Sequence, residues 1–197
     1  YCLHVPLPLL NDRVAFLRRF AKWMDKKYPG VPVNMSEWTH MQGGRDRGMD
    51  SALVMANVMY EDLSVLNVVS WQHWIAVSEV DYCDGLIYIN LDDKSFEMTK
   101  RYYVTGNFSK YVPAGSVRVD VSCDDPELRL LAFKYDGGCA AVVINGTEKE
   151  KELSLPEQYS AVKLAVTDDD SDLCEYDISG SERIKLTPRS VTTVIFR

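Results

Sequence analysis

The chain has 197 residues, of which 46% are hydrophobic and 26% are charged, as in an ordinary globular protein. Its formal net charge of -7 argues against a nucleic-acid partner, because a surface that tracks phosphates needs clustered lysine and arginine. The densest basic group, within residues 18–27, has the spacing of the solvated face of an amphipathic helix. No apolar run is long enough to cross a membrane, so we expect no membrane partner.

Neither the cysteines nor the acidic residues predict a metal site. The number of cysteines is odd, they are widely spaced, and they lack the short Cys/His spacings of zinc ligands. We expect most of them to be buried thiols. The acidic triplet at 168–170 is a candidate calcium loop, but the alternating ligands of such a loop are missing, which favours a solvated hairpin tip. The five cysteines are Cys2, Cys83, Cys123, Cys139 and Cys174.

The first part of the chain opens with a strand end and a proline-rich loop over residues 1–8, and a helix and a short strand follow. Asn11 or Asp12 can cap the helix, and Gly30 is placed to end it. The strand is expected over residues 32–37, where apolar residues on both sides of the pleat favour a parallel sheet covered on both faces. The helix shows apolar residues at helical spacing, namely Val14, Leu17, Phe20, Ala21 and Met24.

A second helix and strand repeat this pattern. A polar, glycine-rich loop over 39–48 leads to a helix that starts at Asp50, and a strand over 66–71 follows. Two consecutive strand–helix units whose strands point the same way predict part of a parallel α/β barrel. A strand over 86–90 and a helix over 96–111 complete this part of the chain.

The pattern changes after Gly115, where short apolar runs alternate with turn residues and no helix intervenes. Such spacing is typical of an antiparallel β-sandwich. We therefore predict an α/β plus all-β chain, with residues 1–115 forming the last strands and helices of a barrel and residues 116–197 forming a β-sandwich. The predicted strands are 116–122, 128–135, 139–145, 152–155, 161–167, 173–178 and 191–196.

Glu37 is the residue around which we organise the functional hypothesis. It ends the strand over 32–37, and carboxylates at the carboxyl ends of strands are typical catalytic residues in parallel α/β barrels. Position alone leaves open that Glu37 is an ordinary surface residue. A retaining glycosidase needs two carboxyl groups about 5–5.5 Å apart, one as nucleophile and one as acid/base.

A series of short blocks, in a fixed order, resembles the C-terminal half of glycoside hydrolase family 30. The series is most similar to the branch that holds the endo-β-1,6-galactanases. The resemblance covers nearly the whole chain and implies retaining hydrolysis by a (β/α)8 barrel followed by a β-sandwich. The blocks are Met35–Trp38, Gly43–Asp46, Asp50–Leu53, Ser70–Trp74, Asp84–Ile87, Thr99–Tyr103, Asn107–Tyr111, Pro113–Gly115 and Pro188–Thr193.

The resemblance also implies roles for individual residues. It assigns Glu37 to the nucleophile at the end of barrel strand seven, and Trp71 to the wall beneath the sugar at the end of strand eight. It places His4 on strand six, where Pro6 stands in place of a tyrosine of the family. The acid/base glutamate of the family lies on strand four, which we expect to precede Tyr1 in a missing N-terminal half of the barrel.

Strand-end aromatics and polar side chains suit a sugar, whose CH faces stack on flat rings while its hydroxyls need hydrogen bonds. Arg45, Arg47 or His4 is placed to keep the nucleophile ionised. Trp71 is alternatively a core residue, and His73 is more typical of a structural hydrogen-bonding residue than of an acid/base group. The candidate sugar-binding residues are Trp71, Trp38, Trp74, His4, Gln72 and Arg45.

These observations predict a retaining hydrolase of β-linked oligo- or polysaccharides that requires no cofactor and no metal. Its partners are a carbohydrate and the missing half of the barrel, without which we expect no useful turnover. We expect the parent enzyme to be secreted or periplasmic. The alternative is a non-catalytic carbohydrate-binding or interaction fragment, because a part-barrel exposes an unpaired strand edge that invites association.

Overall fold

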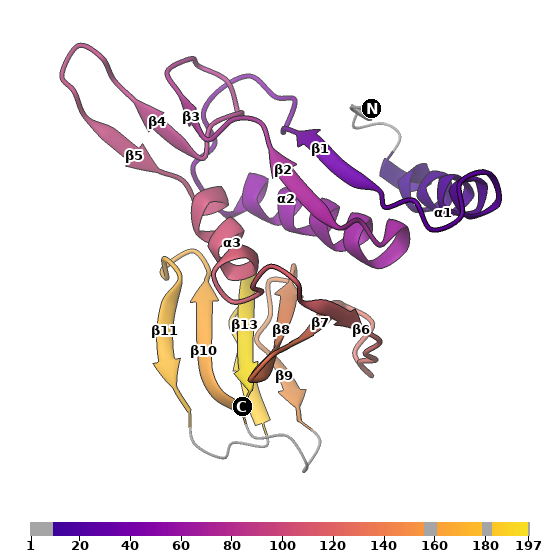
Figure 1. The fold of residues 1–197 in the computed structure, drawn as a ribbon. Coiled ribbons are helices and arrows are strands. Elements are labelled where there is room, and N and C mark those ends of the chain that lie inside the picture. The colour runs from indigo at the N-terminus through magenta and orange to yellow at the C-terminus, as the bar shows by residue number, and fades with distance from the viewer. Residues whose placement is uncertain (1–9, 156–160, 179–182, 197) are drawn as a thin grey trace. The chain divides into compact units, whose positions relative to one another are not determined.

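The structure, a computed structural model, describes residues 10–155, 161–178 and 183–196 (Figure 1). It divides into two compact units, one made of Tyr1–Arg45 with Asn57–Glu97 and the other of Asp46–Ala56 with Met98–Arg197. The proposed boundary at residue 115 stays a prediction. Within the described residues, no helix combines the length and the apolar character needed to span a membrane.

The first unit begins with helix α1, Leu10–Lys27, as the apolar spacing predicted. Its inward face buries Leu17, which packs with Leu66 and Val68 in the core of this unit. The basic residues of 18–27 are exposed, also as predicted. Gly30 follows the helix with a φ of 75°, a left-handed conformation that glycine adopts without steric cost.

Strands β1, Asn34–Trp38, and β2, Ser70–His73, pair in parallel, which confirms the predicted strand direction (Figure 1). Their register places Met35 opposite Trp71. The expectation that this strand is apolar and covered on both faces was wrong. Met35 is buried, whereas Ser36 on the opposite face of the pleat is exposed.

Helix α2, Met49–Glu61, runs directly into a π-helical turn, η2, Asp62–Leu66. Asn67 ends this turn in the left-handed conformation, with a φ of 52°. The sequence predicted a strand that starts at residue 66. Instead, Leu66 closes the π-helical turn, and the strand starts four residues later, because the helical backbone continues past the end of α2.

A three-stranded sheet follows, in the order β3, Val77–Ser78, β4, Ile87–Ile89, and β5, Phe96–Met98. The prediction of a helix from residue 96 was therefore wrong at its start. Helix α3 spans Lys100–Ser109, and the Thr99 side chain caps it by accepting a hydrogen bond from the backbone N–H of Tyr102.

The second unit is built on a six-stranded sheet in the order β11-β10-β13-β8-β7-β6, with antiparallel pairing between neighbours (Figure 1). Strands β9 and β12 form a separate antiparallel pair. The sequence missed β12. The bounds are β6 Val117–Val119, β7 Leu128–Tyr135, β8 Gly138–Asn145, β9 Lys151–Ser154, β10 Ala161–Thr167, β11 Cys174–Asp177, β12 Arg183–Leu186 and β13 Ser190–Phe196.

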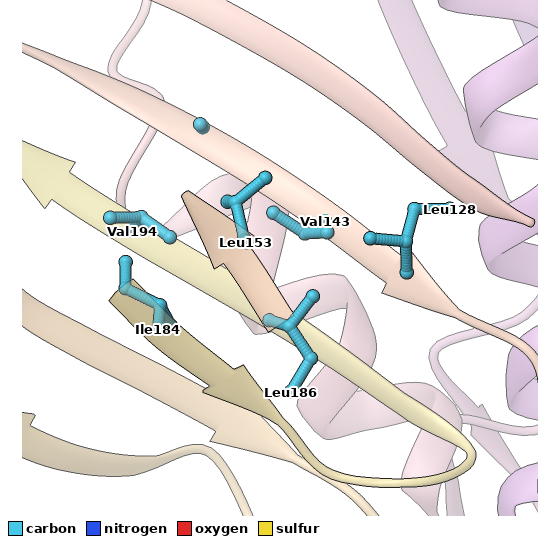
Figure 2. Packing of buried hydrophobic residues seen from close by; sticks show 7 residues of the cluster. Leu128, Val143, Leu153, Ile184, Leu186 and Val194 are labelled. Atoms are coloured by element: carbon cyan, nitrogen blue, oxygen red, sulfur yellow. The ribbon is translucent and has the colours of Figure 1, made fainter. Parts of the chain in front are cut away.

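The β9–β12 pair packs on one face of the six-stranded sheet. Leu153 of β9 and Leu186 of β12 point toward Val143 and Val194 of the sheet (Figure 2). Alternate residues of a strand face opposite sides, and Thr193, next to Val194, contacts helix α3. The sheet is therefore covered by β9–β12 on one face and by α3 on the other.

Two smaller expectations also need correction. Of the cysteines that the structure describes, Cys83 is buried, whereas Cys174 is exposed and the other two are half-buried. The acidic turn at 168–170 is not simply a solvated tip. Asp168 is buried, and its carboxylate accepts hydrogen bonds from the backbone N–H groups of Asp170 and Ser171.

Candidate active site

Glu37 occupies the fourth position of β1, near the carboxyl end of the strand, and its side chain is half-buried. Strand β2 runs in parallel beside it, so both strands end on the same side of this small sheet. The carboxyl ends of the strands are where a parallel α/β barrel enzyme presents its catalytic groups.

Four rings form an aromatic cluster at these strand ends, comprising Trp38, His40, Trp71 and His73. The centroid of Trp38 lies 5.7 Å from that of Trp71 and 6.0 Å from that of His73. The rings of Trp71 and His73 stack at 6.4 Å with an interplanar angle of 26°. His40 lies 6.4 Å from Trp38. The structure thus brings together two of the predicted sugar-binding residues, Trp38 and Trp71.

Trp71 contributes both to this cluster and to the core of the first unit. It packs against the hydrophobic cluster of Leu17, Leu66 and Val68. Its indole Nε1–H donates a 2.9 Å hydrogen bond to Asp62 Oδ2. Trp71 therefore contacts both the core of the first unit and the aromatic cluster.

Trp74 is more exposed than Trp38 and Trp71, with 50% of its surface accessible to solvent. Its backbone N–H donates a 2.7 Å hydrogen bond to the Trp38 carbonyl, which ties the end of β2 to the end of β1. The Trp74–Ile75 peptide bond is cis. Gln72 is exposed and, by the alternation of side chains along β2, projects from the face opposite Trp71 and His73.

Arg45 makes its contacts in the loop that follows β3. Its Nε donates a 2.9 Å hydrogen bond to the Val80 carbonyl, and Nη2 donates to the Glu79 carbonyl. The guanidinium carbon also lies 4.9 Å from the centre of the Tyr88 ring. Arg45 therefore holds this loop in place. Arg47 belongs to the other unit, and His4 lies outside the described residues.

The two histidines of the aromatic cluster are engaged through Nε2. His73 Nε2 donates a 2.8 Å hydrogen bond to the Asp84 carbonyl, which fixes a proton on that nitrogen. His40 Nε2 lies 2.7 Å from Gln42 Oε1. These contacts are the kind that structural histidines make, as anticipated for His73.

Sequence reasoning missed a buried ionic network next to Trp71. Arg13 on α1 donates to Glu61 Oε2 at 2.7 Å and to Asp62 Oδ1 at 2.5 Å. Asp62 is fully buried and Arg13 is 5% exposed. Burial raises the pKa of the Asp62 carboxyl, an effect opposed by the charge of Arg13 and by the hydrogen bond from Trp71. A signal was present, since Arg13 lies one turn before Leu17 on the apolar face of α1.

The described residues contain no group of three or more His, Cys, Asp or Glu side chains arranged to hold a metal ion. The arrangement offers a carboxylate, flat aromatic surface and amide or imidazole groups. This set suits an organic ligand with both hydroxyl groups and apolar faces, such as a sugar.

Residues 21–88, which contain Glu37 and the aromatic cluster, match the family model described as O-Glycosyl hydrolase family 30. The chain is related to glycoside hydrolase family 30. Among curated proteins, it is 27% identical over 124 residues to the lysosomal acid glucosylceramidase of Mus musculus, an alignment that covers 57% of this chain and 23% of that enzyme.

The chain shares its mixed α/β fold with solved structures of family 30 enzymes and of similar proteins. A GH30 endoxylanase from Clostridium papyrosolvens C71 superposes with a TM-score of 0.73 at 20% identity, covering 92% of this chain and 46% of that chain. A conserved exported protein from Bacteroides fragilis superposes with a TM-score of 0.81 at 20% identity, covering 92% and 42%. The chain thus spans less than half the length of these relatives.

Proposed function

We propose that this chain carries the nucleophile of a retaining β-glycosidase and that Glu37 is that nucleophile. In this proposal β1 and β2 are the last two strands of a (β/α)8 barrel, within residues 1–115. The six-stranded sheet with the β9–β12 pair is a β-sandwich side domain, within residues 116–197. The acid/base carboxyl group belongs to a part of the barrel outside the 197 residues.

One observation supports the proposal most. The parallel pairing of β1 with β2 brings the rings of Trp38 and Trp71 together at the strand ends, and Glu37 directly precedes Trp38 in β1. A glycosidase requires this combination, with a carboxylate to attack the anomeric carbon and aromatic surface to hold the sugar. The match of residues 21–88 to the family model covers all three residues.

In the first step a carboxylate oxygen of Glu37 forms an ester bond to the anomeric carbon. The bond between that carbon and the leaving oxygen breaks, and the leaving oxygen keeps the electron pair and takes a proton from the acid group. In the second step water attacks the same carbon, gives its proton to the acid/base group and releases the carboxylate of Glu37. The configuration is inverted twice and is therefore retained.

The residues of this chain hold the sugar in this scheme. Trp74 is 50% exposed, more than Trp38 or Trp71, and Trp38 lies directly after the proposed nucleophile. Gln72 projects from the opposite face of β2, so it is not part of the surface formed by Trp38 and Trp71. Arg45 shapes the site indirectly, because its hydrogen bonds go to main-chain carbonyls of the loop at residues 79 and 80.

An activated fluorosugar tests the nucleophile without the missing acid. In 2,4-dinitrophenyl 2-deoxy-2-fluoro-β-glycosides the leaving group departs as a stable anion, so no proton donor is needed, and the fluorine slows release of the glycosyl group. We expect such reagents, supplied with several sugars, to add one glycosyl mass that peptide mapping locates on Glu37. Glu37→Gln should abolish labelling, whereas Glu79→Gln, at an exposed carboxylate in the neighbouring loop, should preserve it.

The same experiment separates the two functional hypotheses. Labelling of Glu37 together with no hydrolysis of unactivated β-glycosides supports the nucleophile-bearing part of a glycosidase. Sugar binding with no labelling at any reagent concentration overturns the proposal in favour of a carbohydrate-binding fragment.

A further inference from the structure

The carboxylate of Asp62 connects an arginine to the indole of Trp71. It is fully buried at the first position of the π-helical turn η2. Oδ1 accepts from Arg13 Nη2 at 2.5 Å, and Oδ2 accepts from Trp71 Nε1 at 2.9 Å. Each carboxylate oxygen therefore has its own charged or polar donor, and the indole N–H has a fixed acceptor.

This arrangement is costly as a means of stabilising the fold. Removing a carboxylate and a guanidinium from water carries a large desolvation penalty, and well-packed apolar residues often do as well or better. The contribution of the Asp62 carboxylate is to fix the orientation of the Trp71 ring. A hydrogen bond to an indole N–H fixes the rotation of the ring, and burial keeps competing water away from it.

The orientation of Trp71 in turn affects the end of β1. Trp71 lies opposite Met35 in the strand register, and its ring lies 5.7 Å from that of Trp38. Trp38 is the next residue after Glu37, so a tilt of the Trp71 ring alters the packing of the residue that adjoins Glu37 in β1. The π-helical turn that presents Asp62 is a rare backbone form that is frequent at functional sites.

We infer that Asp62, held by Arg13, is a positioning residue that orients Trp71 for sugar binding beside Glu37. The inference rests on the proposed function and deepens it. It assigns a role in that site to a residue of η2, together with its partner on α1. Asp62 acts only through Trp71 and does not itself touch the sugar.

Glu61 provides a matched control. It is the neighbouring acidic residue and binds the other terminal nitrogen of the same arginine, Arg13 Nη1, at 2.7 Å. Asp62→Asn and Glu61→Gln each remove one negative charge next to Arg13. An asparagine at position 62 has a single acceptor oxygen for two donors, so one of its two hydrogen bonds is lost. Glu61→Gln leaves the bond between Asp62 and Trp71 in place.

The experiment measures how the labelling rate of Glu37 depends on reagent concentration in the 197-residue chain. We expect Asp62→Asn to raise the half-saturating concentration about ten-fold, as the loss of one charge-assisted hydrogen bond implies, with a smaller change in the limiting rate. Glu61→Gln should stay within about two-fold of wild type, although both variants lower the unfolding temperature. Equal effects of the two variants on the half-saturating concentration would overturn the inference.

A double-mutant cycle with Trp71→Phe tests whether Asp62 acts through the indole. If it does, Asp62→Asn has little further effect on the half-saturating concentration, or on the near-ultraviolet circular dichroism, once Trp71 is phenylalanine. Additive effects would refute the positioning role while leaving labelling of Glu37 intact. If the wild-type chain is not labelled, the proposed function is refuted. A spectral change on Asp62→Asn that depends on Trp71 would still show that Asp62 orients Trp71.

Discussion

The side chain of Asn107, on α3, donates a 2.9 Å hydrogen bond from Nδ2 to the main-chain oxygen of Ala165 on β10. Its Oδ1 accepts from Thr167 Oγ1 at 2.7 Å, and its own carbonyl accepts from Thr193 Oγ1 at 2.7 Å. Asn107 is fully buried, so these bonds are shielded from water. Asn107, through its side-chain amide and its main-chain carbonyl, thereby joins the helix to two strands of the six-stranded sheet.

We expect Asn107→Ala to lower the free energy of unfolding by about 2–4 kcal/mol, because it leaves buried partners on β10 without a hydrogen bond and opens a cavity. Urea unfolding followed by circular dichroism measures the change. Asn90→Ala, at an exposed turn residue, is the control and should cost less than about 1 kcal/mol. Similar losses of unfolding free energy in both variants would contradict a stabilising role for the buried amide of Asn107.

Arg13→Met tests the buried network of the first unit. The substitution retains much of the apolar stem but leaves Asp62 as a buried carboxylate without its cation, so we expect a loss of about 3–5 kcal/mol. Arg18→Met, at an exposed position of the same helix, should lie within about 0.5 kcal/mol of wild type. If Arg13→Met lowered the unfolding temperature no more than the control does, the assignment of a buried ion pair between Arg13 and Asp62 would be contradicted.

Gly138 begins β8 where another strand approaches closely. A Cβ added there would lie 2.6 Å from the main-chain oxygen of Phe196, which cannot move without shifting β13. We expect Gly138→Ala to destabilise the chain by about 1–3 kcal/mol, as overpacking does. At Gly146 an added Cβ meets no atom within 4 Å, so Gly146→Ala should be nearly neutral. The two melting temperatures, measured side by side, check this difference.

Glu175 on β11 should make stability depend on pH. Its carboxylate accepts hydrogen bonds from Lys110, Lys163 and Tyr111, each at 2.7 Å, and these donors lower its pKa from 4.5 to about 2. Because the folded-state pKa is depressed, this stabilisation is fully present above pH 4.5 and is lost as the pH falls toward 2.

Glu175→Gln should therefore be slightly less stable than wild type at pH 6, with the difference closing as the pH falls to 2. The effect is expected to be small, because the pairs are partly exposed and screened. Added salt should reduce it at pH 6. Urea unfolding midpoints of both proteins across this pH range provide the measurement, and a difference that grows on acidification would contradict the assignment.

The strands of the second unit were the most predictable part of the fold. Residues 128–135 and 161–167 form β7 and β10 with the expected bounds, because short apolar runs between turn residues carry their own signal. Strand β12, Arg183–Leu186, was missed. Its four residues alternate basic and apolar side chains, and only their pairing with β9 makes them a strand.

Local sequence explains less of the candidate site. The position of Glu37 near the end of β1 could be predicted, since the strand and its carboxylate are adjacent in the chain. The contact between Arg13 and Asp62 could not, because these residues lie 49 positions apart. Periodicity indicates that each lies on a helix, but not that the two helices place them together. The start of α3 was also misplaced, because Phe96–Met98 form strand β5 and the cap at Thr99 starts the helix after them.

The π-helical turn of Asp62–Leu66 imposes a constraint on chain length. Each residue of an α-helix turns the backbone by about 100°. A deletion or an insertion between Asp62 and Trp71 would therefore rotate the carboxylate away from the indole, from the arginine, or from both. Homologues that gain or lose one residue in this stretch are expected to have replaced Arg13, Asp62 and Trp71 together. A graft of this segment onto another scaffold must preserve its number of residues.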